Sequence, residues 1–130
     1  MASILKVDTI TGVSTAGSIA VTGEGNSTTT NLQQGLVKAW AKCTNAAGLD
    51  DSFNISGGTD NGTGDYTYAY TNNMANGNFC QVTDTTYASL SSYDGGEMLA
   101  ASFNVRIFTR QDSLELIDDV HVSQVSGDLA

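Results

Sequence analysis

Apolar and polar residues alternate at a period of two over several short stretches of this 130-residue chain. The clearest stretch, residues 66–71, reads YTYAYT and places Tyr66, Tyr68 and Tyr70 on one face of an extended segment. Residues 53–56 alternate in the same way. Between them, residues 57–65 consist of Gly, Thr, Asp and Asn, which favour turns. We therefore expect two antiparallel strands joined by a long Gly-rich hairpin loop.

Further short strands are expected on both sides of this hairpin. The first, residues 36–44, has a small apolar face, and Trp40 lies between two lysines on its other face. Residues 79–84 form another. The longest signal, residues 98–110, has an apolar face that we place in the core: Leu99, Ala101, Phe103, Val105 and Ile107.

A last strand is expected to turn its apolar residues toward the core, namely Leu114, Leu116, Val120 and Val122. His121 then occupies the alternate position, at the surface or at an interface. Six or seven short strands separated by turns describe a small antiparallel β-sandwich. The fold class is all-β, and this head spans residues 36–130.

Residues 1–35 differ from the head and form an N-terminal anchor or stalk with a polar connector. Isolated aliphatic residues are spaced among Thr, Ser, Gly and Asp, without any aromatic residue. Such a segment gains order only by packing on copies of itself or on another protein, because alone it buries too little surface. A disordered tail is the alternative, but tails seldom carry so many aliphatic residues. The candidate anchoring residues are Ile4, Leu5, Val7, Ile10, Ile19 and Val21.

Charge and composition limit the classes of molecule that this protein is expected to bind. The formal net charge is −9, from 14 acidic and 5 basic residues, which disfavours nucleic acid and anionic membranes. No apolar run approaches the length of a membrane span, and residues 1–6 lack the features of a signal peptide, so we expect a protein made in a cytoplasm. Cys43 and Cys80 lack metal-site spacing and are expected to be buried free thiols.

No catalytic constellation is visible in the sequence, so we expect no enzyme activity, cofactor or metal. The chain has one His and no base next to a nucleophile. Residues 60–65 offer oxygen ligands for a hard cation, but they lack the EF-hand spacing.

The aromatic residues are the remaining candidates for a site. Trp40 is either covered by a subunit or loop, or exposed as a ligand platform. The row of Tyr66, Tyr68 and Tyr70 either packs on a facing sheet or neighbouring subunit, or stacks on sugar rings. If a small sandwich is unable to bury both Trp40 and the tyrosine row within one chain, neighbouring subunits would bury them. In that case we expect the head to form a trimer.

Several strings resemble tail-fibre and capsid-fibre proteins of marine bacteriophages. These strings are ASILKVDTI, GSIAVTGEG, GLVKAWAKC and DSFNISGGTDNGTGDYTYAYTNNM, within residues 2–79. The family pattern has a Phe or Asn at the position of Cys43, and one aromatic residue fewer after Asp65.

The resemblance implies a virion structural protein, made in the host cytoplasm and assembled as a homotrimer. Its N-terminal part would fix it to a capsid or tail protein, and its head would face outward and aid adsorption to a host surface glycan. A decoration fibre on the capsid and a tail appendage remain equally compatible. An alternative from a different functional class is a carbohydrate-binding β-sandwich module that works as a monomer.

Overall fold

A computed structural model describes residues 4–12, 19–23, 28–86, 90–92, 98–109 and 115–130 of the chain. The chain divides into two compact units, Met1–Gly35 and Leu36–Ala130. No helix in the described ranges is long and apolar enough to cross a membrane.

The first unit contains a short two-stranded antiparallel sheet. Strands β1 (Ala20–Thr22) and β2 (Thr29–Asn31) pair with Val21 opposite Thr30. Helix α1 (Leu32–Gly35) is a single turn, and Asn31 Oδ1 accepts a hydrogen bond from the Gln34 amide at 3.1 Å. An Asn side chain at this position satisfies one of the otherwise unpaired amides of a helix start.

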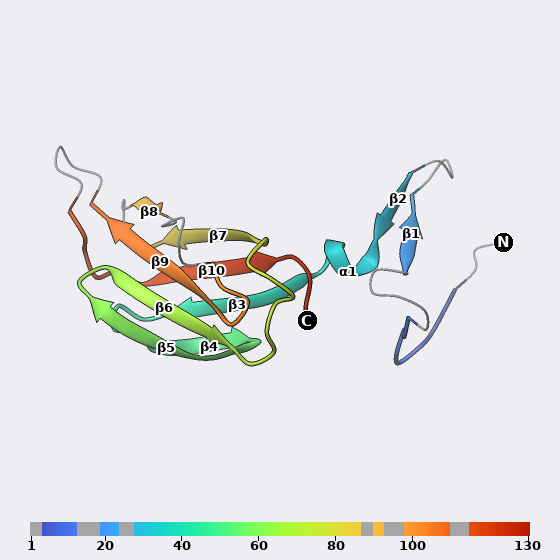
Figure 1. Cartoon of the computed structure of the whole chain (residues 1–130), viewed down its shortest axis with the longest axis horizontal. Coiled ribbons are helices and arrows are strands. Elements are labelled where there is room, and N and C mark those ends of the chain that lie inside the picture. The colour runs from blue at the N-terminus through green and yellow to red at the C-terminus, as the bar shows by residue number, and fades with distance from the viewer. Residues whose placement is uncertain (1–3, 13–18, 24–27, 87–89, 93–97, 110–114) are drawn as a thin grey trace. The chain divides into compact units, whose positions relative to one another are not determined.

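The second unit consists of two four-stranded sheets, which confirms the expected all-β, sandwich-like fold (Figure 1). One sheet has the order β4-β3-β10-β7, and the other has the order β5-β6-β9-β8. Every pairing within them is antiparallel. We name them the tryptophan sheet, after Trp40 on β3, and the tyrosine sheet, after the tyrosines on β6.

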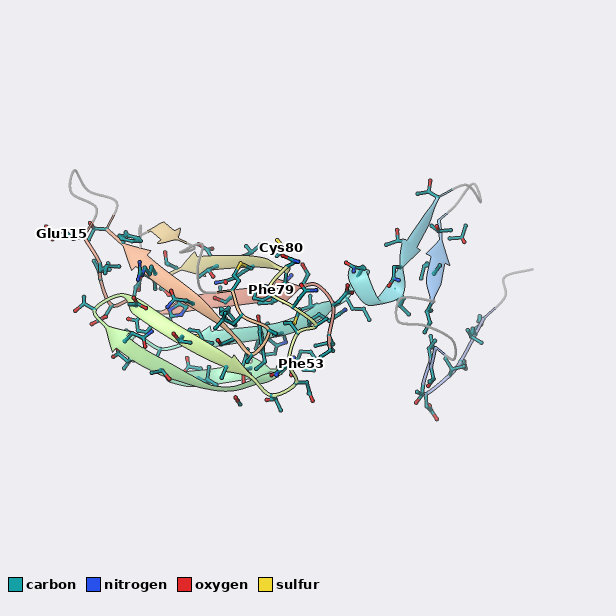
Figure 2. All side chains as sticks on the ribbon, viewed as in Figure 1. Phe53, Phe79, Cys80 and Glu115 are labelled. Carbon is teal, nitrogen blue, oxygen red and sulfur yellow. The ribbon has the colours of Figure 1, made fainter. Side chains whose placement is uncertain are left out.

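The strands of the tryptophan sheet come from both ends of the unit. They are β3 (Val37–Cys43), β4 (Leu49–Phe53), β7 (Cys80–Thr85) and β10 (His121–Ser126). Strand β3 confirms the first expected head strand, and β7 confirms another. Figure 2 shows Phe53 where β4 ends, and Asn54 follows at φ 58°, which breaks the expected 53–56 strand into β4 and β5.

The tyrosine sheet contains β5 (Ile55–Gly62), β6 (Asp65–Tyr70), β8 (Leu90–Ser92) and β9 (Ser102–Phe108). The expected long loop at residues 57–65 is wrong, because β5 continues to Gly62 and pairs with β6. The turn is confined to Thr63 and Gly64. Gly64 has φ 63°, and an added Cβ would lie 2.7 Å from the backbone of Ile107 and Ile117. Glycine is therefore required at this turn.

Strand β9 is shorter than expected, and its apolar face is only partly in the core. Phe103, Val105 and Ile107 are fully buried. Leu99 and Ala101 are exposed instead, because residues 100–101 form a turn that brings Leu99 back onto Ser102. Arg110 lies outside the described residues.

The structure also corrects which side chains of the last strand point into the core. His121 lies opposite Cys43 on β3, and Val122 lies opposite Lys42. Directly opposed residues share a face of the sheet, so His121 points into the core and Val122 points out. His121 is 1% exposed and Val122 is 47% exposed. Leu116 and Val120 precede β10 rather than belonging to it, and Leu114 lies outside the described residues.

The core lies between the two sheets and pairs large side chains with small ones. The tyrosine sheet supplies tyrosines, Phe103, Val105 and Ile107, whereas β3 supplies Ala39, Ala41 and Cys43. Cys43 is a buried free thiol as expected, but Cys80 is an exposed one, since it begins β7 beside Phe79 at the sheet end (Figure 2).

Truncation of Phe103 tests this core. Phe103→Ala should lower the free energy of unfolding by about 3–5 kcal/mol, because it leaves a cavity under the tyrosines. Phe53→Ala is the matched control, since Phe53 is 52% exposed and should cost about 1 kcal/mol or less. Chemical denaturation of both variants gives the comparison, and equal losses would contradict the assignment of the core.

Candidate functional site

The structure places the tyrosine row inside the sandwich, between the two sheets. Tyr66 and Tyr68 are 0% exposed and Tyr70 is 5% exposed. Their rings contact Phe103, Phe79 and His121, at centroid distances of 5.1 to 5.9 Å. The role considered for this row at an interface or a glycan is therefore corrected, because the facing sheet of the same chain already covers it. Of the residues on which the expected head trimer was based, only Trp40 is left to be covered by a neighbouring subunit.

His121 is the centre of a buried polar cluster that the sequence reading missed. Its Nε2 lies 3.0 Å from the Tyr68 hydroxyl, and its Nδ1 lies 3.0 Å from the Asp119 carbonyl oxygen. A carbonyl only accepts, so Nδ1–H donates to Asp119 and Nε2 accepts the Tyr68 proton. The neutral imidazole therefore satisfies both contacts.

Burial controls the ionisation of this cluster. Loss of solvent lowers the pKa of His121, although the Asp119 carbonyl and carboxylate favour the charged ring. Burial also raises the pKa of the Cys43 thiol to about 11, while its hydrogen bond with Tyr68 acts in the opposite direction. At neutral pH, the Cys43 thiol and the His121 imidazole are therefore uncharged.

The cluster has the geometry of a structural centre. His121 is 1% exposed, so a substrate cannot reach the imidazole. Tyr66 stacks on the imidazole at 5.1 Å, and its hydroxyl donates to Asp118 Oδ1 at 2.9 Å. Asp118 also accepts a hydrogen bond from the Gly64 amide at 2.7 Å and so joins the β5–β6 turn to the segment before β10. These contacts link the two sheets.

Trp40 lies on the outer face of the tryptophan sheet and is 38% exposed. It lies opposite Phe53 on β4 and opposite Gln124 on β10, which in turn lies opposite Val82 on β7. The adjacent row across the same strands is Asp51, Lys42, Val122 and Asp84. Phe53, Val82 and Val122 are 52%, 62% and 47% exposed, so this face carries a contiguous apolar surface.

A groove of about 420 Å³ runs over β3, β10 and β7 on this face. Its lining includes Trp40, Lys42, Val82, Asp84, Val122 and Gln124. The Lys42 ammonium lies 3.1 Å from Asp50, in an exposed ion pair. Within the described part of the chain, the Gln124 carboxamide makes no hydrogen bond.

The outer face of the tyrosine sheet is polar, and its side chains make hydrogen bonds and an ion pair with one another. Arg106 Nε lies 3.0 Å from Asp65 Oδ2, and the Asn104 and Asn61 amides donate to Asp65 Oδ1 at 2.8 and 3.1 Å. Burial opposes ionisation of Asp65, but these hydrogen bonds and the Arg106 charge together hold its pKa below the usual value. Among the described residues, no group of three His, Cys, Asp or Glu side chains is placed to hold a metal.

The candidate anchoring residues are exposed in the first unit. Ile4 and Leu5 are 79% and 80% exposed, and Val7, Ile10 and Val21 are 52%, 57% and 51% exposed. Ile19 is half-buried, and its carbonyl accepts a hydrogen bond from the Leu32 amide at 2.8 Å. All members of the buried core cluster belong to the second unit.

Comparisons with protein-family models, with curated proteins and with solved structures gave no significant match.

Two tyrosine substitutions test which hydroxyl groups of the core make hydrogen bonds. The Tyr68 hydroxyl has a partner in His121. The Tyr70 hydroxyl is buried without a hydrogen-bond partner in the described structure. Tyr70→Phe should therefore leave the unfolding free energy unchanged or raise it by up to about 1 kcal/mol. Tyr68→Phe should lower it by about 1–3 kcal/mol, because His121 Nε2 loses its donor. Equal losses in urea denaturation would contradict the described contacts.

The buried histidine should make the stability depend on pH. An unfolded His binds a proton near pH 6.5, whereas the folded pKa is lowered, so below about pH 6.5 the unfolded state binds more protons. The unfolding free energy should fall between about pH 7.5 and about pH 5.5, by at most about 1.4 kcal/mol per pH unit. His121 is the single His of the chain, so His121→Gln should abolish this dependence. A flat wild-type profile would refute the assignment.

Proposed function

We propose that this chain is a bacteriophage virion structural protein, a short fibre or spike with its N-terminal unit fixed to a capsid or tail protein. The observation that carries the proposal is the contrast between the two units. The head buries Tyr66, Tyr68, Tyr70 and Phe103 within one chain, whereas the N-terminal segment presents Ile4, Leu5, Val7 and Ile10 to solvent. Covering such aliphatic surface with another protein surface is favourable, because it removes apolar area from water.

The N-terminal unit is also where we propose that copies associate. The tyrosine row needs no subunit contact, so the exposed aliphatic residues of the first unit are the best-supported contacts for a homotrimer. The resemblance of residues 2–79 to phage fibre proteins supports the trimer and the outward-facing head. The charge of −9 agrees with a partner that is protein rather than nucleic acid or membrane.

A monomeric carbohydrate-binding module is the second candidate. It is favoured by the groove beside Trp40, which a free sandwich would also present. The two proposed functions predict different molecular masses of the protein in solution. Light scattering of the full chain should give three times the chain mass for the fibre and a single chain mass for the module.

Removal of residues 2–31 tests the anchor directly. The truncated protein should stay folded, because the core cluster lies wholly within Leu36–Ala130. It should fail to join particles, which quantitative mass spectrometry of purified virions measures as copy number.

A substitution series sharpens the same test. Serine at Ile4, Leu5, Val7 and Ile10 should lower the copy number at least tenfold, whereas serine at Val82 and Val122 should leave it unchanged. The second variant controls for loss of exposed aliphatic surface, since both valines lie on the head. Wild-type incorporation of the truncated form would show that the head docks the protein, and the anchor assignment would fail.

A further inference from the structure

We propose that the groove beside Trp40 binds one ring of a neutral saccharide. The inference rests on the proposed function only in that the head faces outward, and it adds the site and the chemical class of its ligand. The groove spans β3, β10 and β7, which run side by side in the tryptophan sheet (Figure 1).

The dimensions of the groove suit a small ligand. Its volume of about 420 Å³ falls within the range of small-molecule sites. Its lining combines the apolar Val82, Val122 and Trp40 with the polar Gln124, Lys42 and Asp84. Because these residues lie on neighbouring strands of one sheet, the backbone holds the groove in place without any loop.

The lining has the two chemical features that a sugar ring needs. The indole of Trp40 offers a flat apolar face with negative π density, on which the C–H face of a pyranose packs. The Gln124 carboxamide lies opposite Trp40 and has no hydrogen bond in the described structure, so it can both donate to and accept from hydroxyl groups. Asp84 Oδ1 accepts the Thr85 amide at 2.9 Å, which fixes a carboxylate acceptor at the groove edge.

The charges around the groove favour a neutral ligand. Asp84 and Lys42 line it. Lys42 is already ion-paired with Asp50 at 3.1 Å, and Asp51 lies opposite Lys42 on β4. An anionic sugar would meet these carboxylates and the overall charge of −9. A polyol meets no such cost, because its hydroxyl groups donate to carboxylates.

In the described part of the chain, the opposite outer face differs in character. Its polar groups already bond one another through Asp65, Arg106 and Asn61, and Asn61 Nδ2 also donates to Thr67 Oγ1 at 2.8 Å. The exposed aromatic surface of the described head is thus concentrated on the tryptophan sheet, at Trp40 and Phe53.

The single Trp of the chain allows a direct test, because its fluorescence reports on this groove alone. The full chain is titrated with neutral oligosaccharides of glucose, galactose, mannose and N-acetylglucosamine, and with sialylated forms of the same sugars. We expect a saturable change in Trp40 emission with at least one neutral sugar, and at least tenfold weaker binding of its sialylated form.

Variants locate the binding within the groove. Gln124→Ala should weaken binding by about 3- to 10-fold, as expected for the loss of one hydrogen bond. Val122→Leu should abolish it, because a larger side chain at this lining position fills part of the groove. Ala69→Leu is the matched control, since Ala69 is exposed on the other sheet and the change should leave binding unaffected. All three positions are exposed or at the sheet surface, and melting temperatures verify that the variants fold.

Three results would overturn the inference. They are the absence of an emission change with every neutral sugar at tens of millimolar, equal binding of neutral and sialylated forms, and protection of Trp40 from acrylamide quenching in the unliganded chain. The last result would mean that a second copy covers the groove. Failure here is distinguishable from failure of the proposed fibre, because particle incorporation and solution mass are measured without sugar.

Discussion

Packing of large side chains against small ones holds the two sheets together. Tyr66 and Tyr68 project from β6 toward Ala39 and Ala41 on β3, so their rings reach the facing sheet and bring their hydroxyl groups with them. Buried hydroxyl groups need partners, and His121 is the side chain that supplies one to Tyr68. The register of β10 is thereby fixed, since a slip of one residue would exchange His121 for Val122.

This arrangement completes the core within one chain and leaves the two outer faces with different characters. The face of the tyrosine sheet is closed by its own polar contacts around Asp65. The face of the tryptophan sheet keeps Trp40 exposed beside a groove. Separately, the N-terminal unit presents aliphatic residues, and none of its described residues belongs to the buried core cluster. Attachment through the first unit and recognition on the second are therefore consistent proposals for different parts of the chain.

The sequence predicted the strands that alternate strictly, and it failed where tertiary pairing outweighed local preference. Tyr66, Tyr68 and Tyr70 stand on one face because period two sets direction regardless of context. The Gly-rich run became β5, because pairing with β6 satisfied its backbone despite the turn-forming composition. His121 was misplaced because polarity alone marks a residue as outward, whereas its partner Tyr68 lies 53 positions away. The groove depends on which strands are neighbours, which no local pattern encodes.

The side-chain nitrogens of the single His test the central contact most directly. Long-range ¹H–¹⁵N NMR at neutral pH distinguishes the two neutral tautomers of His121. The Tyr68 and Asp119 contacts predict a proton on Nδ1, an unprotonated Nε2, and slow exchange of the Nδ1 proton with water. A proton on Nε2, or a ring that titrates near the ordinary value of about 6.5 with rapid exchange, would contradict a buried His121 linking the two sheets.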